Sequence, residues 1–360
     1  MRALEELLQA FERRADGRND ASGAPLVGIF GDGLPEALIH AAGATPVEVK
    51  APPLADATTG PQRPEVTEIA EPFLDDFAAR FLHRLADGAF DHMAMVVFAR
   101  DDVAALTAYQ YATEMRRLGM LPATGPRLHL WSLLHSEGAA AERFNRTELD
   151  RLESALQQVT GQGIDTDALA RAQQQEARRL AALARLASHP QAFALRNAGR
   201  WLEAGHHANL LDSLPAPEPA TGRRIGLVGT ACDLPVLHQL AQELGHVAAD
   251  LTPYGDIWPG NHAGPEGVGA LIDSVATHPL HLRANPASKF DTALADGLEG
   301  CDLVLAAVDR NDDGFGWDLP ALSALCKARG TPLVMLGFRP FRPDAAWLEA
   351  ARNKIAEVLS

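Results

Sequence analysis

Two stretches far apart in the chain follow the same order of buried strand, small-residue turn, helix and strand. In the first, the apolar run 24–30 ends in the turn 31–33, and a helical pattern then leads to a strand at 45–51. In the second, the run 223–229 leads through a helical pattern to a strand at 247–256. Short apolar runs bounded by turns predict buried strands. Strands that alternate with helices predict parallel sheets covered on both faces.

Further runs of the same kind extend both series. Strands are predicted at 90–99 and 126–134 in the first series, and at 301–312 and 331–341 in the second, with helices between them. We therefore expect an α/β fold with two doubly wound parallel-sheet lobes of Rossmann or flavodoxin type.

The middle of the chain has a different pattern. Residues 139–186 are rich in Ala, Gln, Arg, Glu and Leu at helical spacing, which predicts two long amphipathic helices. Asn145 or Thr147 is expected to cap the first of these helices, and Asp165 or Thr166 the second.

A Pro- and Ala-rich segment at 213–222 indicates a linker. The predicted division is an N-terminal α/β lobe preceded by a helix at 1–138, a helical connector with the linker at 139–221, and a C-terminal α/β lobe at 222–360.

Charge and composition exclude several classes of partner. The net charge of −15 argues against nucleic acid or an anionic membrane as a bulk partner. No run of about 18 apolar residues is free of charge, so no membrane span is expected.

The N-terminus reads as an amphipathic helix rather than a secretory signal. With only three scattered cysteines, a disulfide framework is not expected either, and we predict a cytoplasmic protein.

Ligands of open α/β sheets bind beyond the carboxyl ends of the strands, so residues in the turns after predicted strands are candidates for a binding site. They are Gly31, Asp32, Gly33, Arg100, Thr230, Cys232, Tyr254, Trp258, His262 and Asn311. The glycine turns do not match a dinucleotide fingerprint and can equally be tight strand-to-helix turns. The loop that carries Tyr254 and Trp258 either lines a pocket or is a structural loop with Trp258 in the core.

Catalytic and metal motifs are not apparent. Acidic clusters at 100–102 and 309–313 lack the spacing of a metal cage, which favours solvated turns. The pair His206-His207, and His278 with His281, lack the partner motifs of zinc sites and are interpreted as surface histidines. We predict no metal and assign no catalytic residue.

The segment VGIFGDGLPEALIHAAGATPVEV (27–49) resembles the start of 2-hydroxyacyl-CoA dehydratase component D and benzoyl-CoA reductase subunits. The match is carried by Phe30, Pro35, Glu36, Leu38, Ala41, Ala42, Gly43, Pro46 and Val47. Residues 96–119, 223–251 and 309–336 resemble later segments of the same family, so the similarity spans most of the chain.

The resemblance implies a lyase or oxidoreductase whose subunits each place three cysteines around one 4Fe–4S cluster, which injects an electron into a CoA thioester. The matching stretches 70–73, 99–102 and 309–313 contain no cysteine. Cys232, Cys301 and Cys326 occupy other positions. Because thiolates must converge on one point to hold a cluster, we expect none here and no electron transfer by this chain alone.

Family enzymes are assembled from two similar subunits, which favours an auxiliary, cluster-free subunit that acts with a cluster-bearing homologue on an acyl-CoA. A homo- or heterodimer with a homologous subunit is expected. A second hypothesis is a small-molecule or acyl-CoA binding or regulatory protein that reuses the two lobes. A third is a redox-independent enzyme, for example a hydratase or transferase, although no acid–base pair stands out in the sequence.

Overall fold

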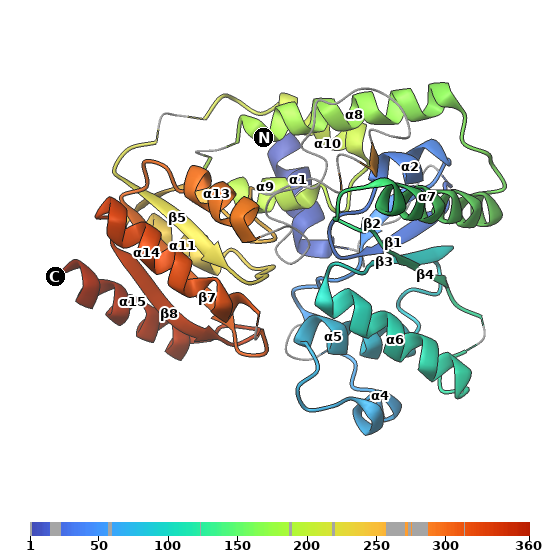
Figure 1. Ribbon diagram of the computed structural model, residues 1–360, viewed down its shortest axis with the longest axis horizontal. Coiled ribbons are helices and arrows are strands. Elements are labelled where there is room, and N and C mark those ends of the chain that lie inside the picture. Colours follow the sequence, from blue (N-terminus) through green and yellow to red (C-terminus); the bar gives the residue numbers. More distant parts are fainter. Residues whose placement is uncertain are drawn as a thin grey trace.

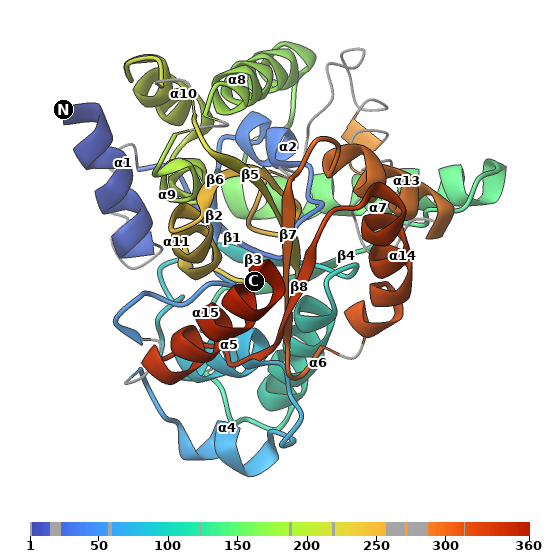
Figure 2. The same ribbon diagram turned by 90° about the vertical axis from the view of Figure 1, so that its left-hand side faces the viewer.

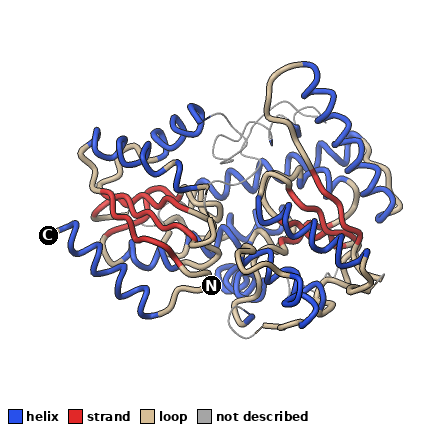
Figure 3. The backbone as a smooth tube through the Cα atoms, turned by 60° about the horizontal axis from the view of Figure 1, so that its bottom comes forward, coloured by secondary structure: helices blue, strands red, loops and turns tan. Residues whose placement is uncertain are grey.

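The computed structural model describes residues 2–14, 23–56, 60–122, 124–186, 189–217, 220–256, 271–272, 275, 287–312 and 314–360. Two separate four-stranded parallel sheets form the framework of this part of the chain, and Figure 3 shows them at opposite ends of the molecule. The predicted α/β class with two parallel-sheet lobes is confirmed. The predicted division at 138 and 221 stays a prediction.

The first sheet has the order β2-β1-β3-β4. Its strands are β1 (Leu26–Phe30), β2 (Thr45–Glu48), β3 (Met95–Ala99) and β4 (Arg127–Trp131). Its neighbouring helices are α2 (Glu36–Ala41), α4 (Pro64–Ile69), α5 (Asp76–Ala86) and α6 (Val103–Arg117). We call this sheet with α2, α5 and α6 the first lobe.

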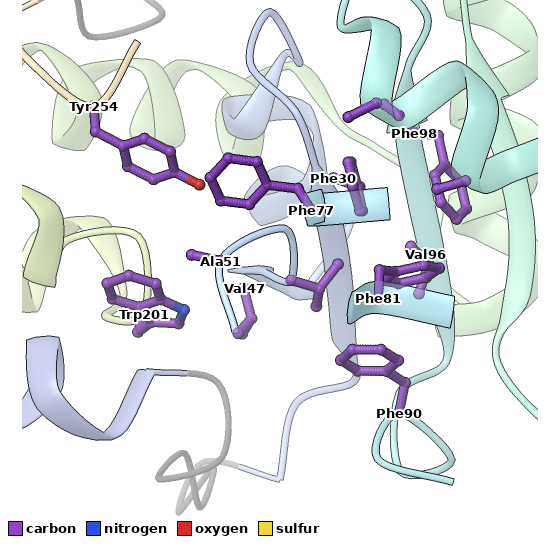
Figure 4. Packing of buried hydrophobic residues seen from close by; sticks show 14 of the residues in the cluster. Phe30, Val47, Ala51, Phe77, Phe81, Phe90, Val96, Phe98, Trp201 and Tyr254 are labelled. Carbon is purple, nitrogen blue, oxygen red and sulfur yellow. The ribbon is translucent and has the colours of Figure 1, made fainter. Parts of the chain in front are cut away.

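Successive residues of the central strands enter two different cores, because side chains alternate across a strand. On β1, Val27 and Ile29 face one core, whereas Phe30 joins the core that includes α5 and α6. The rings of Phe30 and Phe81 meet edge to face with their centroids 5.1 Å apart. Figure 4 labels both residues in this core. Both strands at the centre of the sheet are therefore covered on both faces, as their uninterrupted apolar sequences predict.

The second sheet repeats this arrangement in the order β6-β5-β7-β8. Its strands are β5 (Arg223–Gly229), β6 (Gly245–Asp250), β7 (Leu303–Asp309) and β8 (Leu333–Arg339). Its helices are α11 (Val236–Gln242), α13 (Ala287–Gly297), α14 (Leu319–Arg329) and α15 (Ala345–Leu359), with the short turn η2 (Phe315–Trp317). We call this sheet with its helices the second lobe.

Helices outside the two lobes lie between and beside them (Figures 1 and 2). They are α1 (Arg2–Arg13), α7 (Ala139–Thr160), α8 (Thr166–Ala184), α9 (Ala192–Ala198) and α10 (Ala204–Asp212). Helix α1 packs on α9 and α10, while α8 packs on α10 and on α2 of the first lobe. No helix within the described ranges is long and apolar enough to cross a membrane.

The predicted cap of α7 is wrong, whereas that of α8 is confirmed. Helix α7 begins at Ala139, well before Asn145 and Thr147. The Asn145 side chain instead exchanges two hydrogen bonds with the backbone of Leu134, at 2.7 and 2.9 Å. Asp165 accepts from the Ala168 amide and caps α8.

Candidate functional site

Residues that follow strands of the first lobe contact residues that follow strands of the second. The Tyr254 hydroxyl, after β6, donates to Glu48 Oε1 at the end of β2, at 2.8 Å. Phe77, at the start of α5, meets the ring of Phe341, after β8, edge to face at 4.9 Å. We call the region where these strand ends meet the junction; it contains Glu48, Phe77, Tyr254 and Phe341. It is the place where open α/β sheets bind ligands.

Arg14, which directly follows helix α1, links the two lobes at the junction by hydrogen bonds. Arg14 Nη1 donates to Asp233 Oδ2 at 2.5 Å and to the Pro52 carbonyl at 2.8 Å. Arg342 Nη1 donates to the other carboxylate oxygen of Asp233 at 2.6 Å. Burial alone would raise the pKa of Asp233, but the two guanidinium groups outweigh it and hold the pKa below its usual value.

Glu48 is a buried carboxyl at the centre of the junction. It accepts from Tyr254 and from the Ala51 amide, and Arg200 is the cation that lowers its pKa most. Desolvation outweighs these interactions and raises the pKa of Glu48 to about 7. Burial, and then the nearby Glu48 carboxyl, raise the pKa of the Tyr254 hydroxyl as well. Figure 4 shows the Tyr254 ring beside Phe77.

Replacing Glu48 with Gln is expected to change how stability depends on pH. The folded-state pKa is raised, so the folded chain holds this proton more tightly than the unfolded chain does. The contribution of Glu48 to stability is therefore fully present below the ordinary glutamate pKa of 4.5 and is lost as the pH rises toward about 7. The Gln side chain does not titrate, so the variant does not lose stability in this way. Its free energy of unfolding should therefore rise relative to that of wild type between pH 4.5 and about 7, by at most about 3 kcal/mol. Urea unfolding at a series of pH values measures it, and a constant difference would contradict the prediction.

A lysine and three carboxylates meet at the carboxyl edge of the first sheet. Lys50 Nζ donates to Asp102 Oδ2 at 2.5 Å and lies 5.0 Å from the centre of the Phe77 ring. Asp75 and Asp32 also act electrostatically on Lys50. Burial alone would lower the pKa of Lys50, but the three carboxylates outweigh it and the pKa is raised. The ammonium therefore stays charged.

The structure brings together several of the candidates predicted from sequence. Gly31 and Gly33 adopt positive φ, and a Cβ on Gly31 would lie 2.8 Å from Asp102 Cβ. Glycine at position 31 thus lets Asp102 approach the end of β1. Asp32 accepts from Arg200 Nη1 at 2.8 Å. This geometry is compatible with both alternatives for the turn 31–33, a tight strand-to-helix turn and a turn that lines a ligand-binding site.

In the second lobe, Thr230 and Asn311 form hydrogen bonds with other protein groups. Thr230 Oγ1 accepts from the Asp309 amide at 2.6 Å and ties β5 to the end of β7. Asn311 Nδ2 lies 3.4 Å from Asp76 Oδ2 across the junction. Arg100 is exposed and its amide donates to the Trp131 carbonyl at the end of β4.

Other predicted positions lie elsewhere. Trp258, His262, His278 and His281 lie outside the described residues. The interpretation of His207 as a surface histidine is wrong: it is buried, Nε2 lies 3.0 Å from the Leu195 carbonyl, and burial lowers its pKa to about 3. His206, in contrast, is exposed and pairs with Glu6.

The residues that sequence reasoning missed are charged groups of the junction. Glu48 and Lys50 interrupt an apolar strand end, and this pattern was a usable signal. Asp75 precedes the apolar pattern of α5, as an N-cap does, and accepts from the amides of Phe77 and Ala78. Arg14 gave no signal, because its partner Asp233 lies 219 residues away.

The three cysteines do not fit a cluster. Cys232 belongs to the core on one face of the second sheet, with Leu303 and Leu305 of β7. Cys301 and Cys326 belong to the core on the opposite face. The sheet therefore separates the thiols, which cannot converge on one group of iron atoms. Within the described ranges, no group of three or more His, Cys, Asp or Glu residues has the arrangement of a metal site.

Comparison with known proteins points to one family. The sequence profile of a family described as 2-hydroxyglutaryl-CoA dehydratase, D-component, matches residues 33–345. No curated protein matches the chain. Among solved structures, the SBP FpvC from Pseudomonas aeruginosa in complex with Mn2+ is 14% identical, over 93% of this chain and 97% of that chain, with a TM-score of 0.23. That score is too low to indicate a shared fold or ligand.

Proposed function

Since the chain belongs to the 2-hydroxyglutaryl-CoA dehydratase D-component family, we propose that it is a cluster-free auxiliary subunit that acts with a cluster-bearing homologue on an acyl-CoA. The observation that carries this proposal is the distribution of the thiols. Cys232 is separated by a β-sheet from Cys301 and Cys326, and all three are buried. An electron-transfer step would then belong to the partner chain.

The junction supports the other half of the proposal. Ion pairs and hydrogen bonds between protein groups order the ends of both sheets, as the bonds of Lys50 to Asp102 and of Tyr254 to Glu48 illustrate. These bonds would hold the two lobes of a cluster-free chain together. Such a chain can still present a partner surface and the wall of an acyl-CoA site.

The first test is metal content. Protein purified without oxygen, and then incubated with ferrous iron and sulfide, is expected to contain no more iron or acid-labile sulfide than a control protein treated in the same way. Cys232→Ser should leave this result unchanged. Stable incorporation of iron and sulfide with visible absorption, lost in the Cys232 variant, would overturn the cluster-free assignment.

The second test is partnership. Co-expression with a homologue of similar length that keeps the cluster cysteines is expected to give a stable complex that dehydrates a 2-hydroxyacyl-CoA, with each chain alone inactive. A homodimer that never exchanges with such a homologue would favour the alternative, a protein that binds small molecules or acyl-CoA by itself. The alternative draws on the direct bonds between the two lobes within one chain, such as that of Tyr254 with Glu48.

A further inference from the structure

Arg14 reaches both lobes with a single guanidinium group. Its Nη1 donates to the carbonyl of Pro52, which follows β2 in the first lobe, at 2.8 Å. In the turn after β5 of the second lobe, Asp233 accepts from Nη1 through Oδ2 at 2.5 Å and from Nη2 through its carbonyl at 2.7 Å. Only 1% of the Arg14 surface is exposed. The lobes therefore cannot separate at this place unless Arg14 gives up its bonds to one of them.

Helix α1 carries Arg14 to this position and lies between the two lobes in Figure 1. Its buried residues Leu7 and Phe11 belong to the same core as Phe193 of α9. The rings of Phe11 and Phe193 meet edge to face with their centroids 5.9 Å apart. The Arg14 guanidinium lies over the Phe11 ring, 5.3 Å from its centre. The packing of α1 on α9 and the placement of the guanidinium thus depend on each other.

The segment on which α1 packs is itself bound to both lobes. Asn197 Nδ2 donates to the Tyr254 carbonyl after β6 at 2.9 Å. Trp201 Nε1 donates to the Glu48 carbonyl at the end of β2 at 3.0 Å. Hinges between domains are formed by a few residues at the ends of elements. A rotation of one lobe against the other would be centred on this segment.

The contact made by Arg14 can be broken reversibly. Arg14 has φ of +54°, a left-handed conformation that is unfavourable for a residue with a Cβ and persists where surrounding contacts impose it. Release of Arg14 relaxes this strain. Asp233 then keeps two bonds from Arg342 of the same lobe, at 2.6 and 2.9 Å. The buried carboxylate therefore stays neutralised when Arg14 leaves it.

We propose that α1 together with Arg14 forms a strap that holds the two lobes together at the junction, and that release of the strap lets the lobes turn apart. Closed and open arrangements are then in equilibrium, and the strap sets their ratio. Access to the buried Glu48 carboxyl depends on this ratio. The proposal requires neither an acyl-CoA nor a partner subunit.

The distance between the lobes, measured in the full chain by double electron–electron resonance, tests the strap. Spin labels are attached at Thr113→Cys in α6 and Glu349→Cys in α15, two exposed positions, while the three native cysteines are buried. Arg14→Gln loses the charge that binds Asp233. The ratio of a longer distance to the main distance of wild type should therefore rise about 10-fold or more. Phe11→Ala, which weakens the packing of α1, should act in the same direction.

Arg342→Gln is the matched control. Arg342 binds the same Asp233 carboxylate but lies in the same lobe as Asp233, so its loss should leave the distance between the lobes unchanged. Unchanged distances in both Arg14→Gln and Phe11→Ala, or equal changes in Arg14→Gln and Arg342→Gln, would overturn the proposal. Circular dichroism establishes that each variant is folded.

Hydrogen exchange of the wild-type chain gives a second measurement that needs no variant. If the strap is released from the folded protein, the amides of Leu7 and Phe11 should exchange through this partial opening, faster than the central amides of β1 and β5. Exchange of the α1 amides only together with those of both sheets would mean that α1 leaves its place only on global unfolding, and the proposal would fail.

Discussion

Asp233→Asn is expected to destabilise the protein by about 3–5 kcal/mol, because it leaves a buried arginine without its anionic partner. The Asp233 carboxylate and the Arg14 side chain are 1% and 0% exposed, and Arg342 shares the same carboxylate. Asn keeps the shape of the side chain, so the variant measures the loss of charge. Chemical denaturation near neutral pH gives the free energy of unfolding.

Asp212→Asn is the control for this prediction. Asp212 also pairs with two arginines, Arg178 and Arg185, but its side chain is 32% exposed. Its loss should cost about 1 kcal/mol or less, because solvent screens surface pairs. Equal effects of the two substitutions would show that burial of the Asp233 cluster does not matter to stability.

Acid should remove the Asp233 contribution selectively. The folded pKa is below the ordinary aspartate value of 3.8, so the stabilisation is complete above that pH and is lost as the pH falls toward the folded pKa. The difference in the free energy of unfolding between wild type and Asp233→Asn should therefore become smaller only in that acidic range.

Gly229→Ala is expected to cost at least about 3 kcal/mol, through a clash that no side-chain movement relieves. Gly229 has φ of +148°, and a Cβ there would lie 1.9 Å from the Ala307 carbonyl oxygen on the adjacent strand β7. The clash is with backbone, so the sheet itself would have to shift. The turn that follows carries Thr230, whose hydroxyl accepts from the Asp309 amide.

Gly161→Ala separates the clash from the effect of backbone conformation. Gly161 has φ of +72° and nothing within 4 Å of an added Cβ. Left-handed backbone costs a non-glycine residue about 1–2 kcal/mol, which is the whole effect expected there. Thermal unfolding of both variants measures the difference, and a Gly229 variant no less stable than the Gly161 variant would contradict the argument.

Much of the fold was predictable because its signals are local. The apolar run that ends at Phe30 and the run that ends at Gly229 are each bounded by small residues, and both are central strands. The start of α7 was not predictable from its polar residues. Asn145 resembles a cap, but it serves the backbone of Leu134, a tertiary contact that no local pattern encodes.

The candidate site was only partly predictable for a similar reason. Strand-end positions such as Asp32 and Tyr254 follow from the rule that ligands meet the carboxyl edge of a sheet. Their partners do not: Tyr254 and Glu48 are 206 residues apart, and burial of Glu48 depends on the meeting of two lobes. Sequence patterns located the strand ends but not which of their charges come together.

The position of Arg14 also bears on the order in which the chain can assemble during synthesis. Helix α1 is made well before its packing partner α9, which begins at Ala192. The carboxylate that Arg14 pairs with, that of Asp233, lies 219 residues after Arg14. At about 5–20 residues per second, a ribosome needs roughly 10–40 s to reach that carboxylate. Until α9 has been made, the apolar face of α1 lacks this packing partner in the nascent chain, so the final packing of α1 must follow the synthesis of more than half of the chain.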